Sequence, residues 1–582
     1  MKSTMHLTSA DYLVIVGYFV VILAIGLWVK RTQATSADFF AGGHQVPWWM
    51  AGISHYMSSF SAFAFIVYSQ MAYVYGWVAI TIFWTGVPAC ILGGTVFARR
   101  WRRARVITPI EFLEQRCNAN IRQLYVWVGI PSKLFDGGLK IFATAMFLSV
   151  AVGLRLDLSI VLCGGVVVAY TLTGGLFALV VADYVQFLMK SLAILLLLPL
   201  ALWRIGDLRH SFSGIPPQMF HLTAHPYNWI YVMGYAVVVV LSYNGNWALA
   251  QKYYCVPDER AANKAAYLSA ALTFAGSPIM FLPAILARKF LPDLIAQRKT
   301  EDVYVLLLLE LLPVGMIGIV VAAMFSATMA AVSADLNAIA GVLTKDWYQR
   351  QWNQDAQEKT LMRAGRGFTL LLGSIVVCLS LWLAHSHYQS LFQMMVTVLG
   401  VLVAPTLLPV LCLLIWRSLS AGGVICGLCS GLLAGICMVL VDQLVLRPQH
   451  LPDNTLLAWQ GAAILINTSV TILGLYIGSK IWSAVGAEKE RTKRFFAALE
   501  KPVLPGELRE NKAVSHPATI IGFTTCAVAL LLIAAGAISG VRSARLIDFA
   551  CGGILLVIGC SSLFAGRARP EEKILREIVI ER

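Results

Sequence analysis

Long apolar runs, separated by short polar stretches, follow one another along almost the whole chain. Hydropathy predicts roughly fifteen spans, most of them close to the ~20 residues that a helix needs to cross a bilayer. These spans cover residues 11–29, 48–73, 77–98, 123–152, 158–180, 183–203, 227–250, 266–287, 313–343, 367–384, 388–416, 420–441, 458–479, 517–539 and 547–565. The pattern predicts an all-α polytopic membrane protein.

One predicted span carries polar side chains that a lipid-facing helix would not tolerate. The stretch MFSATMAAVSADLN, residues 324–337, contains Ser326, Thr328, Ser333, Asp335 and Asn337. With about 100° between successive residues, Ser326, Ser333 and Asn337 share one face of a helix. Thr328 and Asp335 lie on nearly the opposite face. Polar groups are costly in hydrocarbon, so we expect this helix to be buried on both sides.

Polar residues also occur in three further spans. The stretch Ser58-Ser59-Phe60-Ser61 interrupts an apolar helix, and serines loosen a helix locally because they compete for backbone hydrogen bonds. Asp183 lies at the start of another span. Asp136 and Lys140 are four residues apart in a third span, where such a pair either neutralises itself or takes part in coupling. Several helices therefore turn polar groups inward, as transporters do to form a polar site and as channels do to line a pore.

Composition and charge agree with a membrane protein. Charged residues make up 13% of the 582 residues, hydrophobic residues 58%, and the formal net charge is +15. With the N-terminus outside and the C-terminus in the cytoplasm, the basic clusters at 98–106, 345–366 and 488–496 face the cytoplasm, as the positive-inside bias requires. The charge thus indicates topology rather than nucleic-acid binding. No loop is long enough for a catalytic domain, so we predict no enzyme activity.

Five motifs in order resemble the sodium/solute symporter family, the family of the sodium–glucose and sodium–proline transporters. They are FFAGGHQVPWWMAGIS (39–54), ITPIEFLEQR (107–116), YTLTGGLFALVVADYVQ (170–186), AQKYYCVPDERAANKAA (250–266) and ADLNAIAGVLTKDWY (334–348). The resemblance runs from about Asp38 to Arg417. It implies an inverted repeat of two five-helix units, each opening with a broken helix whose carbonyls can hold a cation.

The resemblance also divides the chain. We expect an extra N-terminal helix and loop (1–46), two five-helix repeats (47–205 and 206–418), additional helices (419–483), a cytoplasmic linker (484–516) and C-terminal helices with a short tail (517–582). That makes one extra N-terminal helix and about four C-terminal helices. The first break would be the Ser58–Ser61 cluster, and the second would lie near Tyr243–Trp247.

At the expected sodium site the chain departs from the family pattern. The resemblance assigns the carbonyl ligands to Met57, Phe60 and Ala327, and two hydroxyl positions to Ala330 and Ala331. A small hard cation needs a nearly complete oxygen shell to replace its water, so these alanines weaken the site.

Other groups could take over the coupling. Asp183 and Ser333 match an acidic and a hydroxyl position beside an inner cation site of the family. A proton on Asp335 or His55 is an alternative, because buried carboxylates and imidazoles can titrate in the working pH range. His55 could equally be a core histidine bonded to a carbonyl.

The candidate solute site combines hydroxyl, aromatic and amide side chains. By register, the glutamate that grips sugar hydroxyls in the family falls on Phe83, and the glutamine falls near Val396 with Gln393 close by. Asn246 replaces an acidic residue, so the resemblance to sugar carriers weakens. The candidates are Ser59, Phe83, Trp84, Asn244, Asn246, Trp247 and Gln393. They suit a small, partly apolar organic solute.

We therefore predict a secondary active transporter, a symporter that moves a small organic solute by alternating access, coupled to a cation at a degenerate sodium site. An uncoupled or proton-coupled carrier and a transporter-like solute sensor are the alternatives. The expected partners are the solute, Na⁺ or H⁺ and the lipid bilayer, with no cofactor, no nucleic acid and no obligate protein partner. The expected location is a plasma membrane or a bacterial inner membrane.

Overall fold

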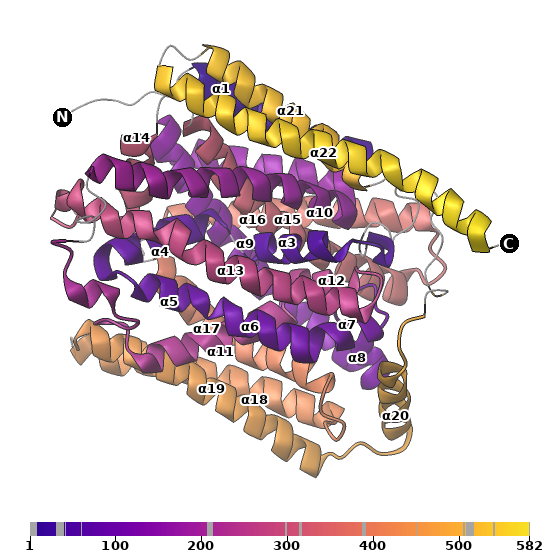
Figure 1. Ribbon diagram of the computed structural model, residues 1–582. Coiled ribbons are helices and arrows are strands. Elements are labelled where there is room, and N and C mark those ends of the chain that lie inside the picture. Colours follow the sequence, from indigo (N-terminus) through magenta and orange to yellow (C-terminus); the bar gives the residue numbers. More distant parts are fainter. Residues whose placement is uncertain are drawn as a thin grey trace.

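The computed structural model consists of helices that run roughly side by side (Figure 1). It describes residues 9–30, 40, 42–59, 61–206, 213–296, 300–312, 317–386, 391–449, 451–504, 507, 517–538 and 542–580. Within these residues the only strand-type pairing is an isolated bridge between Ala224 and Tyr227. The predicted all-α architecture is therefore confirmed.

A central group of helices forms the core of the molecule. It consists of α3 (Trp48–Ser58), α4 (Ala62–Tyr75), α5 (Val78–Trp84), α6 (Gly86–Leu92), α7 (Ala98–Arg103), α8 (Glu111–Arg116), α9 (Ala119–Val152), α10 (Leu156–Ile205), α11 (Trp229–Gly245), α12 (Trp247–Tyr254), α13 (Glu259–Leu286), α14 (Val303–Leu311), α15 (Ile317–Val342), α16 (Glu358–Ala384) and α17 (Leu391–Leu413).

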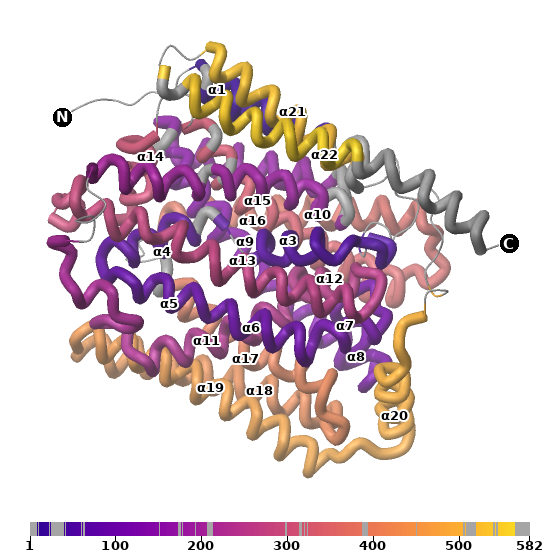
Figure 2. The backbone as a smooth tube through the Cα atoms, viewed as in Figure 1, coloured from indigo at the N-terminus to yellow at the C-terminus, as the bar shows by residue number. Residues whose placement is uncertain are grey.

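Accessory helices cover the core on two sides. On one side α1 (Ser9–Lys30) packs with α21 (Pro517–Ile538) and α22 (Arg542–Ile580). On the other side lie α18 (Ala421–Val441) and α19 (Asp453–Ile481), and the short α20 (Gly486–Glu500) lies at one end of the bundle. The backbone trace shows the same layers, with α21 and α22 at the top and α18 and α19 at the bottom (Figure 2).

The helices match the predicted membrane spans. Ten described helices are long and apolar enough to cross a membrane, or eleven when the bent pair α11–α12 counts as one. Helix α9, which carries Lys133, Asp136 and Lys140 in its middle, is not among them. Neither are α3 and α4, because a break divides that span into pieces of 11 and 14 residues.

Helix α10 doubles back on itself. Its 50 residues would extend about 75 Å if straight, far more than a bilayer needs. Yet Asp157, near its start, lies 3.9 Å from His385 after α16, and Arg204, near its end, pairs with Glu310 of α14 at 3.1 Å. Midway, Leu176 faces Gly42 beside the start of α3, at the other end of the bundle. The two arms correspond to the spans predicted at 158–180 and 183–203. Leu179–Ile205 is long and apolar enough to cross a membrane, whereas Leu156–Leu172 is a shorter apolar helix.

The two broken helices run in opposite directions. The N–H of Val46, just before α3, donates to the carbonyl of Cys255, just after α12, at 3.0 Å. At their far ends, the ring of Tyr75 in α4 meets the ring of Tyr227, just before α11, with centroids 5.1 Å apart. This antiparallel arrangement is what an inverted repeat requires.

The charged stretch after α19 contains a docked helix. Phe495 of α20 stacks on Phe112 of α8 with centroids 5.7 Å apart, and the Arg116 guanidinium lies 5.5 Å from the centre of the Phe496 ring. Arg105 holds Glu507 at 2.6 Å, which lowers the pKa of that carboxyl to about 2. We call this end, where α7, α8 and α20 meet, the basic end.

Close helix packing makes a first prediction. A Cβ added to Gly234 of α11 would lie 2.4 Å from the Gly461 carbonyl oxygen of α19, so Gly234→Val must push the helices apart. We expect a loss of about 1–3 kcal/mol, measured as a lower unfolding midpoint in detergent. Gly165→Val is the control, because a Cβ there meets nothing within 4 Å. Equal effects of both changes would contradict this packing.

Candidate solute and cation site

The first break separates α3 from α4 at the predicted serine cluster. Helix α3 ends at Ser58, and Ser61 is extended, with φ −149° and ψ 173°, before α4 begins. The Ser59 hydroxyl donates to the Tyr56 carbonyl at 2.8 Å. This bond occupies a backbone carbonyl of α3, and side-chain bonds of this kind loosen a helix. Phe60 lies outside the described residues.

The second break separates α11 from α12, which meet at an angle of 50°. Asn246 occupies the break with an extended backbone, and its side-chain oxygen accepts the N–H of Ala248 at 3.1 Å. The same oxygen accepts the Lys133 ammonium of α9 at 2.8 Å. Asn246 therefore caps the new helix and fixes the break to α9.

A cavity of about 160 Å³ lies between the two breaks. Helices α3, α4, α5, α9, α11 and α17 contribute to its wall, and its polar lining comprises Ser58, Ser59, Ser61, Tyr68, Thr85, Asp136, Lys140, Tyr235, Ser242, Tyr243 and Asn246. Phe83 closes one side and packs edge-on against Tyr68, with ring centroids 5.1 Å apart. We call this space the central cavity. Hydroxyls, aromatic faces and one charge pair thus surround it.

Four charged side chains form one cluster beside the central cavity. Lys140 of α9 lies 2.7 Å from Asp136 and 3.2 Å from Asp335 of α15. Lys133 lies 3.7 Å from the other oxygen of Asp335 and sits over the Trp247 ring. The cluster is neutral, because two lysines face two aspartates. The three predicted coupling candidates Asp136, Lys140 and Asp335 therefore meet in one place.

Helix α15 is buried on every side, as its opposed polar stripes predict. The 18-residue stretch of highest hydropathy within Val320–Trp352 is completely buried. On one face the Ser326 hydroxyl donates to the Tyr18 hydroxyl of α1. On the opposite face Thr328 accepts the hydroxyl of Thr144 of α9 at 2.5 Å. Asn337 is fully buried, and neither atom of its amide has a hydrogen-bond partner in the described part of the chain.

The expected cation ligands lie on buried parts of α3, α10 and α15. Met57, Ala327, Ala330 and Ala331 are all buried. The Ser333 hydroxyl donates to the Met329 carbonyl at 2.5 Å, a bond within its own helix that leaves its oxygen lone pairs available. At the two positions that the family resemblance assigns to hydroxyl ligands, this chain therefore has buried alanine methyl groups.

Asp183 and His55 are tied to neighbouring helices. The Ser54 hydroxyl of α3 donates to the Asp183 carboxylate of α10. The His55 ring lies 3.0 Å from the Ser269 hydroxyl and 3.3 Å from the Tyr243 carbonyl, so it bonds a carbonyl as a core histidine would. Lys252 of α12 is fully buried and has no hydrogen-bond partner among the described residues.

The structure separates the candidate solute residues into two groups. Ser59, Phe83 and Asn246 line the central cavity. The Asn244 amide instead donates to the carbonyls of Ala89 and Val240, at 3.0 and 2.9 Å. Trp84 stacks on Phe274, and Trp247 lines a smaller adjoining cavity with Lys133. The side chain of Gln393 lies outside the described residues.

Lys133 is the main residue that the motifs did not single out. The spacing of charged residues in the sequence indicates it, because residues 133, 136 and 140 stand at positions i, i+3 and i+7 and therefore share one helix face. Tyr68 and Tyr235, whose hydroxyls are 2.6 Å apart in the cavity wall, carried no comparable signal.

Fold and site together define a multi-pass transporter built from two inverted repeats with a cavity between broken helices. Residues 39–431 match the sodium:solute symporter family, and the chain belongs to that family. It is a cation-coupled symporter that moves a solute by alternating access.

Relatives of the chain carry several solutes. The sodium/sialic acid symporter NanT of Aliivibrio fischeri is 25% identical over 68% of this chain and 81% of its own. The sodium/glucose cotransporter of Vibrio parahaemolyticus is 26% identical over 73% and 84%. The human sodium/myo-inositol cotransporter 2 is 26% identical over 76% and 71%. A solved structure of a Na⁺-coupled sialic acid symporter, bound to substrate and open outward, shares the fold with a TM-score of 0.68 at 19% identity, covering 82% of this chain and 99% of that one.

Charge balance in the cluster makes a second prediction. Asp335→Asn leaves Lys133 and Lys140 facing only Asp136, so one buried positive charge loses its partner. We expect a loss of about 3–5 kcal/mol, seen as a lower thermal unfolding midpoint in detergent. Adding Lys133→Met restores neutrality and should recover much of that loss. If the double variant is no more stable than Asp335→Asn, charge balance does not hold the cluster.

Proposed function

We propose that the central cavity binds a small organic solute that is uncharged or zwitterionic. The observation that carries this proposal is the composition of the cavity wall, in which Asp136 and Lys140 neutralise each other at 2.7 Å. Because this pair is neutral, a solute with a net charge would bring an uncompensated charge into a low-dielectric cavity. Serine and tyrosine hydroxyls supply hydrogen bonds, and Phe83 supplies an apolar face.

We propose Na⁺ as the coupling ion, held weakly at a modified site. The carbonyls of Met57, Phe60 and Ala327 would remain as ligands, with Asp183 nearby as the negative charge. Water in the space beside the Ala330 and Ala331 methyls would replace the missing hydroxyls, at the cost of a looser shell. The buried Asn337 amide, which lacks a hydrogen-bond partner among the described residues, supports a hydrated region along α15.

The orientation follows from the basic end. Arginines of α7 and the charged helix α20 gather there, and cytoplasmic loops carry an excess of Lys and Arg. We propose that this end faces the cytoplasm, with the N-terminus outside, in a plasma membrane or a bacterial inner membrane.

Restoring the two hydroxyls makes a third prediction. Ala330→Ser with Ala331→Thr adds two oxygen ligands, and we expect the Na⁺ concentration for half-maximal uptake to fall about tenfold. Uptake is measured in proteoliposomes with a panel of uncharged and zwitterionic solutes, with Na⁺ and H⁺ gradients imposed separately. Ala322→Ser, which adds a hydroxyl to the same buried helix about two turns away, is the control.

Wild-type uptake that saturates at low millimolar Na⁺ would contradict a weakened site. A second candidate ion is the proton, because Asp183 and Lys252 are both fully buried and burial disfavours the charged form of each side chain. Uptake driven by the H⁺ gradient alone would support this alternative. Solutes that bind but never accumulate would instead indicate a sensor.

A further inference from the structure

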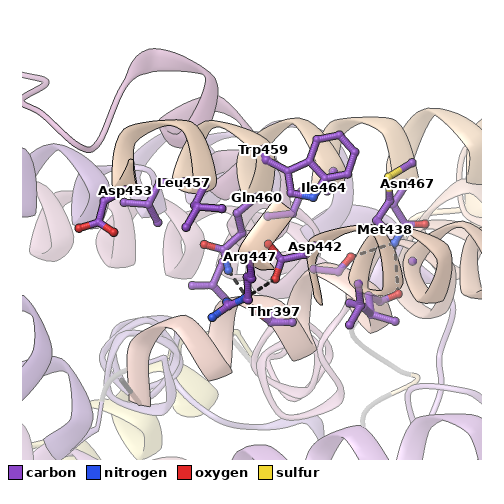
Figure 3. Close-up of a pocket in the computed structure, with 17 residues that line it drawn as sticks. Thr397, Met438, Asp442, Arg447, Asp453, Leu457, Trp459, Gln460, Ile464 and Asn467 are labelled. Carbon is purple, nitrogen blue, oxygen red and sulfur yellow. Dashed lines mark hydrogen bonds and ion pairs between the residues drawn. The ribbon is translucent and has the colours of Figure 1, made fainter. Parts of the chain in front are cut away.

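A separate cavity, of about 190 Å³, lies outside the transport core between α17, α18 and α19. It is found at the end of the bundle opposite the basic end, where α18 ends and α19 begins. Its polar lining consists of Thr397, Asp442, Arg447, Asp453, Gln460 and Asn467, with Trp459 beside them (Figure 3). We call it the accessory cavity. A cavity that faced only lipid would not need so many polar groups.

The inner part of the accessory cavity contains an unused hydrogen-bond acceptor. Asn467 is only 1% exposed, and its amide N–H groups donate to the carbonyls of Gly400 and Val401, at 2.8 and 3.2 Å. Its side-chain oxygen has no hydrogen-bond partner among the described residues. A buried acceptor left unpaired costs about 1–3 kcal/mol, so a molecule that donates a hydrogen bond there gains affinity.

The charged groups near the mouth favour a neutral donor-rich molecule. Arg447 donates through Nε to Asp442 at 2.8 Å, which offsets both charges. Asp453 is exposed and adds one negative charge, which disfavours an anion. The side chains of Gln460 and Thr397 share a hydrogen bond of 3.2 Å between the mouth and Asn467.

The spacing of these groups limits the size of the molecule. Gln460 and Asn467 are seven residues apart on α19, so they lie on one face with a separation of about 10 Å. A molecule of monosaccharide size, with a hydrogen bond at each end, spans that distance. The half-buried Trp459 offers an apolar face on which the C–H side of a ring can lie.

Helix α17 separates the accessory cavity from the central cavity. Thr397, Gly400 and Val401 line the accessory cavity, whereas Met395 and Leu399 of the same helix line the central cavity. A molecule in the accessory cavity would therefore hold α17 against α18 and α19. Alternating access requires rearrangement around the central cavity, so such a molecule would oppose it.

We propose that the accessory cavity binds a small neutral polyhydroxylated molecule, which donates to Asn467 and Gln460 and steadies α17. The binding site itself is independent of the proposed transport ion and solute. Only its effect on transport rests on the proposed function.

Ligand binding to the 582-residue chain in lipid nanodiscs tests this proposal. Myo-inositol and D-glucose serve as neutral polyol probes, and D-glucuronate serves as the anionic counterpart. We expect both neutral probes to raise the thermal unfolding midpoint with a saturating dependence, and glucuronate to bind more weakly. Asn467→Leu should weaken the neutral probes about tenfold. Gln449→Ala, an exposed residue near the mouth that does not line the cavity, should leave their affinity unchanged.

Two further variants and a hydrogen-exchange measurement test the proposal independently. Gln460→Ala, which removes the second proposed acceptor, should also weaken binding if Asn467→Leu fails to fold. Tyr235→Phe in the central cavity should not, which separates the two cavities. Hydrogen exchange of the α17 amides should slow when a probe is bound. Polyol binding that is absent, or that survives both accessory-cavity variants, would overturn the proposal.

Discussion

A charged side chain inside a bilayer must find its opposite charge on the protein, because hydrocarbon supplies neither water nor ions. In this chain the requirement is met by the cluster of Lys133, Asp136, Lys140 and Asp335. Asp335 comes from α15 and the other three residues come from α9, so the cluster fixes the relative position of two core helices. Through Lys133 and Asn246 it also reaches the break between α11 and α12. The helix that holds the expected cation ligands is thus connected to the wall of the central cavity.

The same requirement explains how each broken helix is stabilised. A break frees backbone groups that hydrocarbon cannot satisfy, so nearby side chains must bond them. At the second break Asn246 caps α12, and the Asn244 carbonyl accepts the indole N–H of Trp101 at 3.0 Å. At the first break the Ser59 hydroxyl donates to the Tyr56 carbonyl of the preceding turn. The central cavity is therefore polar for a structural reason before any solute enters it.

Some of this arrangement is readable in the amino-acid sequence, and the reason is periodicity. The opposed stripes of residues 324–337 predict burial on two sides, and Tyr18 and Thr144 are the partners that the structure adds. Hydropathy also separates the two arms of α10, although they form one continuous helical element. Apolar patterning thus predicts the spans and the buried faces.

Partners across helices are harder to predict, because they depend on distant segments. Lys133 and Asp335 are about two hundred residues apart in the chain, and no local pattern pairs them. Asn244 and Trp247 suit a solute by residue type, yet their positions beside a break give them structural contacts. The docking of α20 depends on the Phe112 and Arg116 surfaces of a distant helix, so its charged sequence indicates only a linker.

The alanines at the expected sodium site bear on affinity more than on coupling. Coupling between ion and solute is a free-energy difference between states, and it is reciprocal. An ion that binds every state weakly can still bias the equilibrium, provided that it binds one state much better than the other. Met57 lies on α3 and Ala327 on α15, so carbonyls from these two helices would hold an ion together only while the helices are close. At the proposed site these carbonyls would therefore distinguish between states, whereas a hydroxyl pair confined to α15 would mainly add affinity.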